Sequence, residues 1–264
     1  MRASGARCCS PFYNEEGIER LVPSALRRPF DAAMVDAIEA TRPEIVSFRF
    51  GLPGAALLER VRATGALVFG TATTPDEIRW LGVAGVDVVI AQGAEAGGHA
   101  GWFLDGHQPT PLAELLRTRT ASVMVAAGGI ADAGGFARAL RRGASAVQLG
   151  TVFLAAPESL ASAVHRALLG TDAQTVFTNL FSGREARGFR NRLIDTIGPI
   201  NPAAPHFPYA STALAPLRAK AEAEGRGDYS PLWAGTAANR ARPEAAEALT
   251  RRLAAETLAL LEIA

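Results

Sequence analysis

Cysteine is scarce in this chain, and no hydrophobic run is long enough to cross a membrane. The two cysteines, Cys8 and Cys9, are adjacent, which gives neither a disulfide framework nor the ligand spacing of a zinc site. We predict two reduced thiols and no metal site. No apolar run reaches the roughly 18 residues of a membrane span, and residues 1–30 lack the apolar core of a signal peptide. These absences predict a cytoplasmic protein with no membrane partner.

An excess of charge of one sign is also missing. The chain has 27 Lys and Arg residues against 26 Asp and Glu residues, and its formal net charge is +1. This balance gives no electrostatic argument for nucleic acid as a partner. With 264 residues, of which 48% are hydrophobic, the chain is long enough for one α/β domain with a sizeable core. We therefore expect a single domain over residues 1–264.

Strand-like and helix-like segments alternate in the middle of the chain. Short apolar runs predict five strands, at residues 44–50, 66–70, 86–91, 122–126 and 145–149. The predicted helices between them begin at recognisable capping residues such as Thr74 and Asp132. This order is typical of a parallel sheet with right-handed crossover connections.

The number of strands limits the architecture that we predict. A closed (β/α)8 barrel needs eight strands, and we find no credible strand run beyond residue 155. We expect an α/β fold, an incomplete TIM-type barrel of about the last five βα units with a helical C-terminal region. In this division residues 1–43 are an irregular lead-in, residues 44–155 the strand and helix core, and residues 156–264 helices and loops.

The predicted strand at residues 86–91 leads into a glycine-rich turn that carries His99. Gly97 and Gly98 have no Cβ, so a flat ligand can lie against their backbone. An imidazole presented there can exchange protons near neutral pH. Parallel α/β enzymes keep their chemistry at the carboxyl ends of the strands. We therefore predict that His99 is catalytic, whereas His107, His165 and His206 have no comparable surroundings.

Two further predicted strands end in glycine-bearing turns, at residues 128–129 and 148–151. Backbone N–H groups in such turns can point at a phosphate, and glutamine side chains at strand ends can pair with a ring that offers donor and acceptor edges. FMN fits this combination, because it has a phosphate at one end and a flat polar ring at the other. The residues predicted to bind it are Gln92, Gly97, Gly98, Gly128, Gly129, Gln148, Leu149, Gly150 and Thr151.

Six segments resemble the nitronate monooxygenases, formerly called 2-nitropropane dioxygenases. Three carry the predicted site: Ala-Gln-Gly-Ala-Glu-Ala-Gly-Gly-His at residues 91–99, Ala-Ala-Gly-Gly-Ile-Ala-Asp at 126–132 and Val-Gln-Leu-Gly-Thr-Val-Phe at 147–153. The other three lie at residues 46–53, 182–191 and 233–235. The motifs are long and ordered, and the resemblance covers most of the chain from about residue 26.

The resemblance implies a TIM barrel that binds FMN and oxidises alkyl nitronates with O2 to a carbonyl compound and nitrite. It implies that His99 is the catalytic base or the partner of the nitronate. It also implies FMN contacts from Gln92, Gly97, Gly129 and residues 148–151. The expected partners are a small alkyl nitronate and O2, and a homo-oligomer is left open.

Two alternatives remain open. The Gly-Gly-His turn also resembles that of the FMN-dependent enoyl-acyl-carrier-protein reductases, although the segments at 182–188 and 233–235 favour the nitronate monooxygenases. The strands with which the family opens have no counterpart in this chain, so a truncated, non-catalytic remnant is the second alternative. A start further upstream, a degenerate copy or a partner chain that closes the sheet would each account for their absence.

Overall fold

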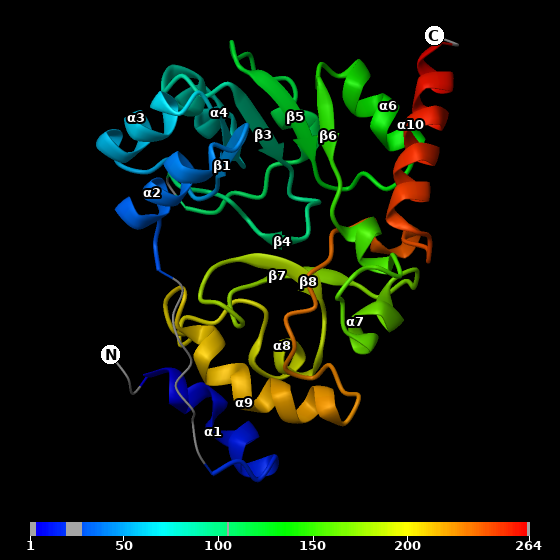
Figure 1. The fold of residues 1–264 in the computed structure, drawn as a ribbon. Helices are drawn as coiled ribbons and strands as arrows, with labels where there is room; N and C mark the ends of the chain where they lie inside the picture. Colours follow the sequence, from blue (N-terminus) through cyan, green and yellow to red (C-terminus); the bar gives the residue numbers. More distant parts are fainter. Residues whose placement is uncertain (1–3, 20–27, 105, 263–264) are drawn as a thin grey trace. The chain divides into compact units, whose positions relative to one another are not determined.

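The computed structural model describes residues 4–19, 28–104 and 106–262. The chain divides into two compact units, whose elements are labelled in Figure 1. The sheet unit comprises residues 28–96, 100–149 and 250–264, and the hairpin unit comprises residues 1–27, 97–99 and 150–249. The three residues that include His99 therefore group with the hairpin unit, although their neighbours in sequence belong to the sheet unit. The expected single domain stays a prediction.

The sheet unit contains a five-stranded parallel sheet in the order β1-β2-β3-β5-β6 (Figure 1). Its strands are β1 (Ile45–Phe48), β2 (Leu67–Ala72), β3 (Val88–Gln92), β5 (Val123–Ala127) and β6 (Ala146–Gln148). Each predicted strand is present and parallel to its neighbours. The expected α/β class is confirmed, and over the described ranges the sheet stays open rather than closing into a barrel.

Helices follow the strands along the sheet unit. They are α2 (Ala32–Thr41), α3 (Ala55–Ala63), α4 (Pro75–Val83), α5 (Leu112–Leu115), α6 (Ala133–Arg141) and α10 (Ala246–Glu262), of which α10 begins in the hairpin unit. The predicted caps are confirmed: Thr74 accepts the N–H of Glu77, and Asp132 accepts that of Gly135. A capping side chain satisfies an N–H group that has no partner inside its own helix.

The two faces of the parallel sheet differ in burial. One face carries Val46, Val68 and Val89, which pack with side chains of α2 to α6 into one core. On the other face Ile45, Leu67 and Val123 are 47%, 47% and 49% exposed. The parallel register places Ile45 beside Leu67 at the amino-terminal ends of β1 and β2, whereas Val88 of β3, which lies beside Val123, is buried.

The hairpin unit is built differently. Its elements are α1 (Ser4–Glu15), β4 (Gly98–His99), the 3₁₀ turn η1 (Thr151–Ala155), α7 (Ala163–Leu168), β7 (Thr175–Thr178), β8 (Ala186–Phe189), α8 (Arg192–Ile197), α9 (Ala210–Ala223) and η2 (Ala238–Arg240). The strands form an antiparallel sheet in the order β4-β8-β7.

Two expectations for the ends of the chain are wrong. Residues 156–264 are not helices and loops alone, because β7 and β8 lie there as four-residue strands. A strand of that length with Arg187 and Gly188 at its centre carries no apolar run, and cross-strand pairing stabilises it instead. The lead-in is also less irregular than predicted, since α1 includes Cys8 and Cys9.

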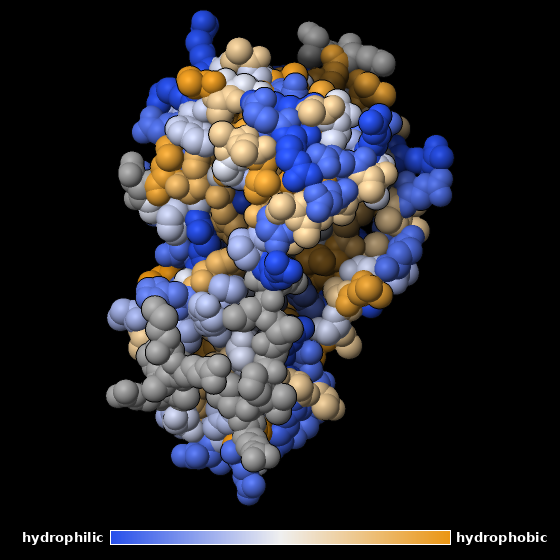
Figure 2. Space-filling view, turned by 60° about the vertical axis from the view of Figure 1, so that its left-hand side comes forward, coloured by the Kyte–Doolittle hydropathy of each residue, from blue (hydrophilic) through white to orange (hydrophobic). Residues whose placement is uncertain are grey.

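On the face in Figure 2, hydrophilic and hydrophobic residues are mixed. Scattered apolar residues of this kind are normal on a protein surface. Among the described helices, none is long and apolar enough to cross a membrane.

Candidate functional site

In the hairpin unit, His99 is fixed through both its backbone and its ring. The strand β4 pairs His99 with Ala186 of β8. The imidazole Nε2 lies 2.8 Å from the Oγ of Ser182, a side chain that is 7% exposed. A partly buried hydrogen bond of this length holds the orientation of an imidazole.

The hydroxyl of Ser182 has further partners that limit the proton arrangement. Its Oγ lies 3.1 Å from the carbonyl oxygen of Arg184, to which it can donate, and 3.3 Å from the N–H of the same residue. When the hydroxyl donates to that carbonyl, its oxygen can accept a hydrogen bond from the Nε2–H group of His99. When Nε2 carries no hydrogen, the hydroxyl can instead donate to it, so the 2.8 Å contact is compatible with either tautomer of His99.

Two aromatic rings, those of Trp233 and Phe207, pack against the imidazole. The ring centroid of Trp233 lies 5.5 Å from that of His99, and the Phe207 centroid lies 5.8 Å away at an interplanar angle of 77°. Phe181 packs edge-on against Trp233 at 5.6 Å. The imidazole thus lies beside the hydroxyl of Ser182 and the rings of Trp233 and Phe207.

Gly97 permits a close approach of two segments within the hairpin unit. A Cβ built on Gly97 would lie 2.5 Å from the backbone N of Gly235 and 2.6 Å from the carbonyl carbon of Ala234. The N–H of Gly235 donates to Oγ1 of Thr151 at 2.9 Å. The segment 233–235 therefore connects three predicted site residues, Gly97, His99 and Thr151.

In the sheet unit, the remaining predicted site residues lie at the carboxyl ends of three neighbouring strands. Gln92, Ala127 and Gln148 form one row across β3, β5 and β6. At the usual strand spacing, Gln92 and Gln148 are about 10 Å apart along this row. Gly128 and Gly129 follow β5 with φ values of 115° and 67°, which are accessible mainly to glycine.

The side chain of Gln92 has a structural contact. It is 5% exposed, and its Oε1 accepts the N–H of Gly101 at 2.8 Å. Gln148, at the end of the edge strand β6, is exposed, and Leu149 is half-buried. Gln92 therefore holds the segment that follows His99, while Gln148 presents its amide at the surface of the unit.

The backbone after His99 has a second fixed point within the sheet unit. The carboxylate of Glu77, 1% exposed, accepts the N–H groups of Phe103 and Leu104 at 2.5 and 3.2 Å. Phe103 packs edge-on against Trp80 at 5.1 Å. These contacts and that of Gln92 fix the backbone at residues 101–104.

The structure thus brings Gly97, His99 and Thr151 together in one unit, with Gly98 and Gly150 beside them in sequence and open space where their Cβ atoms would lie. It groups the other predicted residues at one edge of the sheet unit. Sequence reasoning assigned no role to Ser182 or Phe207. Ser182 lies in a motif that carries the family resemblance, which is the only signal that could have found it, and Phe207 has no such signal.

Histidines elsewhere have other surroundings. Nε2 of His165 lies 3.1 Å from the carbonyl oxygen of Trp233, and burial lowers the pKa of His165 below its usual value. His206 is exposed. Within the described ranges, no group of three or more His, Cys, Asp or Glu residues is placed to hold a metal ion.

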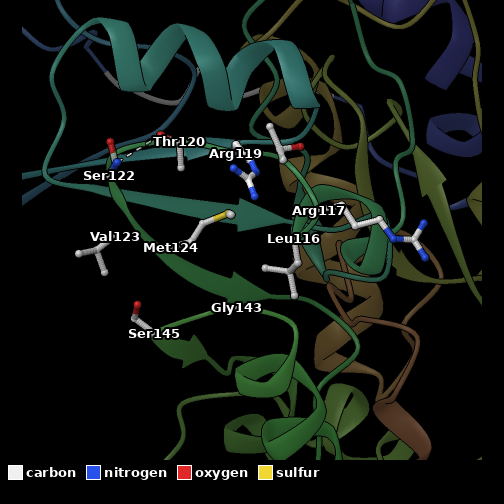
Figure 3. A pocket seen from close by; sticks show the side chains of 10 residues that line it. Leu116, Arg117, Arg119, Thr120, Ser122, Val123, Met124, Gly143 and Ser145 are labelled. Atoms are coloured by element: carbon white, nitrogen blue, oxygen red, sulfur yellow. Dashed lines mark hydrogen bonds between the residues drawn. The ribbon is translucent and has the colours of Figure 1, made fainter.

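A separate cavity of about 690 Å³ lies at the opposite, amino-terminal ends of β5 and β6 (Figure 3). Arg117, Arg119 and Ser122 line it from the connection before β5, and Gly143 and Ser145 line it from the segment before β6. Because the predicted site residues of the sheet unit follow the strands, this cavity does not include them.

Comparisons with known proteins agree on one family. The family model described as nitronate monooxygenase matches residues 13–256. A nitronate monooxygenase of Pseudomonas aeruginosa is 40% identical over 257 residues, which are 93% of this chain and 73% of that protein.

Two solved structures are also similar to this chain. The nitroalkane oxidase from Streptomyces ansochromogenes is similar with a TM-score of 0.89 and 36% identity, over 98% of this chain and 77% of that one. FabK from Thermotoga maritima is similar with a TM-score of 0.73 and 26% identity, over 90% of this chain and 75% of that one. This chain thus spans about three quarters of the length of each relative.

Proposed function

This chain belongs to the nitronate monooxygenase family, and from that premise we propose that it uses FMN and O2 to oxidise alkyl nitronates to a carbonyl compound and nitrite. The observation that carries the proposal is the 2.8 Å contact between His99 and Ser182 beside the rings of Trp233 and Phe207. A reactive imidazole next to apolar rings suits a small substrate with one polar nitro group.

The residues present fit the cofactor. A Cβ on Gly98 or Gly150 would meet open space, so the backbone at both positions is accessible to a ligand. Residues 128–129 present left-handed glycine backbone after β5, and Gln148 presents an exposed amide after β6. As the motifs predict, the glycine turns at 128–129 and 150–151 would offer backbone N–H groups to the phosphate, and the amides of Gln92 and Gln148 would pair with the ring. When bound, FMN would supply the transfer of electrons from the substrate to O2.

His99 and Ser182 supply the acid–base part of the proposed reaction. A nitronate carries negative charge on its nitro group, to which an imidazole N–H of His99 can donate. A neutral nitroalkane must first lose the proton on the carbon that bears the nitro group, and the same imidazole can accept it. Ser182 orients the ring through the contact with Nε2 in either case.

The first test measures O2 uptake and nitrite release with propyl-2-nitronate by the FMN-loaded protein. We expect turnover by the unchanged chain, and a loss of roughly 100- to 10,000-fold in kcat/KM for His99→Ala, because a positioned acid–base group contributes about that much. FMN absorbance measured on the same samples checks that the variant still binds the cofactor. His206→Ala, which removes an exposed histidine of the same unit, is the matched control and should keep its rate within about twofold.

Two other results would contradict the proposal. Rapid bleaching of bound flavin by NADH under anaerobic conditions, without O2 uptake on nitronates, would favour the reductase alternative. An unchanged melting temperature at millimolar FMN would favour a remnant without the site, since a ligand that binds only the folded state must raise stability. The proposed location is the cytoplasm.

A further inference from the structure

Phe207 is an exposed aromatic side chain beside the proposed acid–base residue. Its ring is edge-on to His99 at 5.8 Å, and the residue is 42% exposed. Large apolar side chains left partly open to solvent next to a polar reactive group are typical of binding sites. The opposite neighbour, Trp233, is half-buried and contacts both His99 and Phe181.

The backbone that presents Phe207 is closely packed. Gly183 has φ +88°, and a Cβ there would lie 2.1 Å from the carbonyl oxygen of Pro205 and 2.4 Å from the N of Phe207. The segment at 205–207 therefore rests directly on the residue that follows Ser182. The N–H of Tyr209 donates to the carbonyl oxygen of His206 at 2.8 Å and turns the chain after Phe207.

Trp233 is fixed in a similar way. A Cβ on Gly188 would lie 2.9 Å from the Trp233 ring, so the indole packs against the backbone of β8. The Trp233 ring thus packs on the backbone of β8, and the segment that carries Phe207 packs on Gly183 in the connection between β7 and β8. Aromatic rings mounted on rigid backbone offer a preformed apolar surface at little cost in conformational entropy.

We propose that Phe207 and Trp233 form the wall that binds the alkyl group of the substrate, and that Phe207 sets the preference for longer apolar chains. The inference rests on the proposed function and names the substrate class of the same site, nitronates with an unbranched apolar chain. The imidazole of His99, oriented by Ser182, holds the nitro group, and each added methylene of the chain covers more of the Phe207 ring. Burial of one methylene is worth about a fourfold gain in binding.

The test uses the FMN-loaded protein and the nitronates of nitroethane, 1-nitropropane, 1-nitrobutane and 1-nitropentane. We expect kcat/KM to rise about fourfold for each methylene in the unchanged protein, chiefly through KM. In Phe207→Ala the rise should fall below about twofold per methylene, chiefly through KM. Phe207→Leu keeps apolar surface and should be intermediate, which a purely structural role would not produce.

Tyr209→Ala is the matched control, because it removes another exposed aromatic ring, 55% exposed, from the same segment. It should keep the full dependence on chain length. The inference is overturned if kcat/KM rises equally with chain length in Phe207→Ala and in the unchanged protein. It is also overturned if kcat/KM does not rise with chain length in the unchanged protein.

A second measurement separates this inference from the proposed function. Binding of the corresponding neutral nitroalkanes is measured by the shift in melting temperature, which needs no turnover. A shift that grows with chain length and is lost in Phe207→Ala supports the wall even if no nitronate is oxidised. Shifts that do not depend on chain length contradict it even if turnover is found.

Discussion

Among the described residues, each unit contains one buried glutamate, and the two are stabilised in opposite ways. Glu77 of the sheet unit, 1% exposed, accepts from uncharged donors: the N–H and hydroxyl of Thr73 at 2.6 and 2.8 Å and the backbone of residues 103–104. Glu16 of the hairpin unit, 7% exposed, faces Arg226 at 2.9 and 3.0 Å, Tyr229 at 3.0 Å and Lys220 at 3.7 Å.

The difference shows two solutions to the cost of burying a carboxylate. Backbone N–H groups and a hydroxyl satisfy Glu77 and at the same time fix the loop after His99. A guanidinium that is itself one third exposed compensates Glu16, and hydrogen bonds from Arg226 hold the pKa of Glu16 below its usual value. The contacts of Glu77 should contribute the same stability at low and high salt. The contacts of Glu16 should contribute less stability as the salt concentration rises.

The largest effect is expected from Glu77→Gln. The amide would turn an NH2 group toward backbone N–H donors and leave them without an acceptor, at a cost of about 3 kcal/mol in the free energy of unfolding. Urea denaturation measures this loss, which should be the same at low and high salt. Asp76→Asn is the matched control, because Asp76 is exposed in the same helical turn, and it should lose less than about 1 kcal/mol. Equal losses in the two variants would show that the buried contacts of Glu77 contribute little.

A smaller effect is expected from Arg226→Ala. Removal of the guanidinium leaves Glu16 with Tyr229 and Lys220, and we expect a loss of about 2 kcal/mol at low salt. The loss should shrink in 1 M KCl, unlike that of Glu77→Gln. Arg218→Ala, which breaks a pair with Glu222 in which Arg218 is 48% exposed, should cost no more than about 0.5 kcal/mol. A loss for Arg226→Ala that is independent of salt would remove the distinction between the two glutamates.

The smallest effect concerns pH and the hairpin unit alone. Burial lowers the pKa of His165 in the folded protein, while its unfolded value stays near 6.5. The unfolded chain therefore binds more protons as pH falls below about 6.5, and stability is lost through that window and kept above it. His165→Gln does not titrate, so its urea midpoint should fall less than that of the unchanged protein between pH 7.5 and 5.5. Urea midpoints that fall equally with pH in the two proteins would show that His165 is not the group responsible for the loss of stability.

The elements of the sheet unit could be predicted because their signals are local. The strand β3, four apolar residues and Gln92, is buried at all five positions, and Thr74 and Asp132 cap helices within three residues of themselves. Even there, one contact was not predictable. The Glu77 side chain leaves the helix terminus to accept from residues 103–104, which lie 26 and 27 positions further along the chain.

The hairpin unit was harder to predict because its signals are not local. The strand β8 pairs with β4 and β7 and meets Trp233 at Gly188, whose missing Cβ is what allows the contact. None of these segments has an apolar run of its own. The assignment of FMN to residues in both units stays a prediction from motifs, and His99 stays the proposed catalytic residue.

The sequence by itself determined the five parallel strands, the helix caps and the glycine turns, because hydrophobic periodicity and capping act over a few residues. Only the tertiary structure decided that Ser182, 83 residues beyond His99, is the partner of its imidazole and that Phe207 and Trp233 flank it. Such contacts depend on the antiparallel pairing of short strands and on backbone packing at Gly97, Gly183 and Gly188. No pattern within one segment encodes which distant segment it will meet.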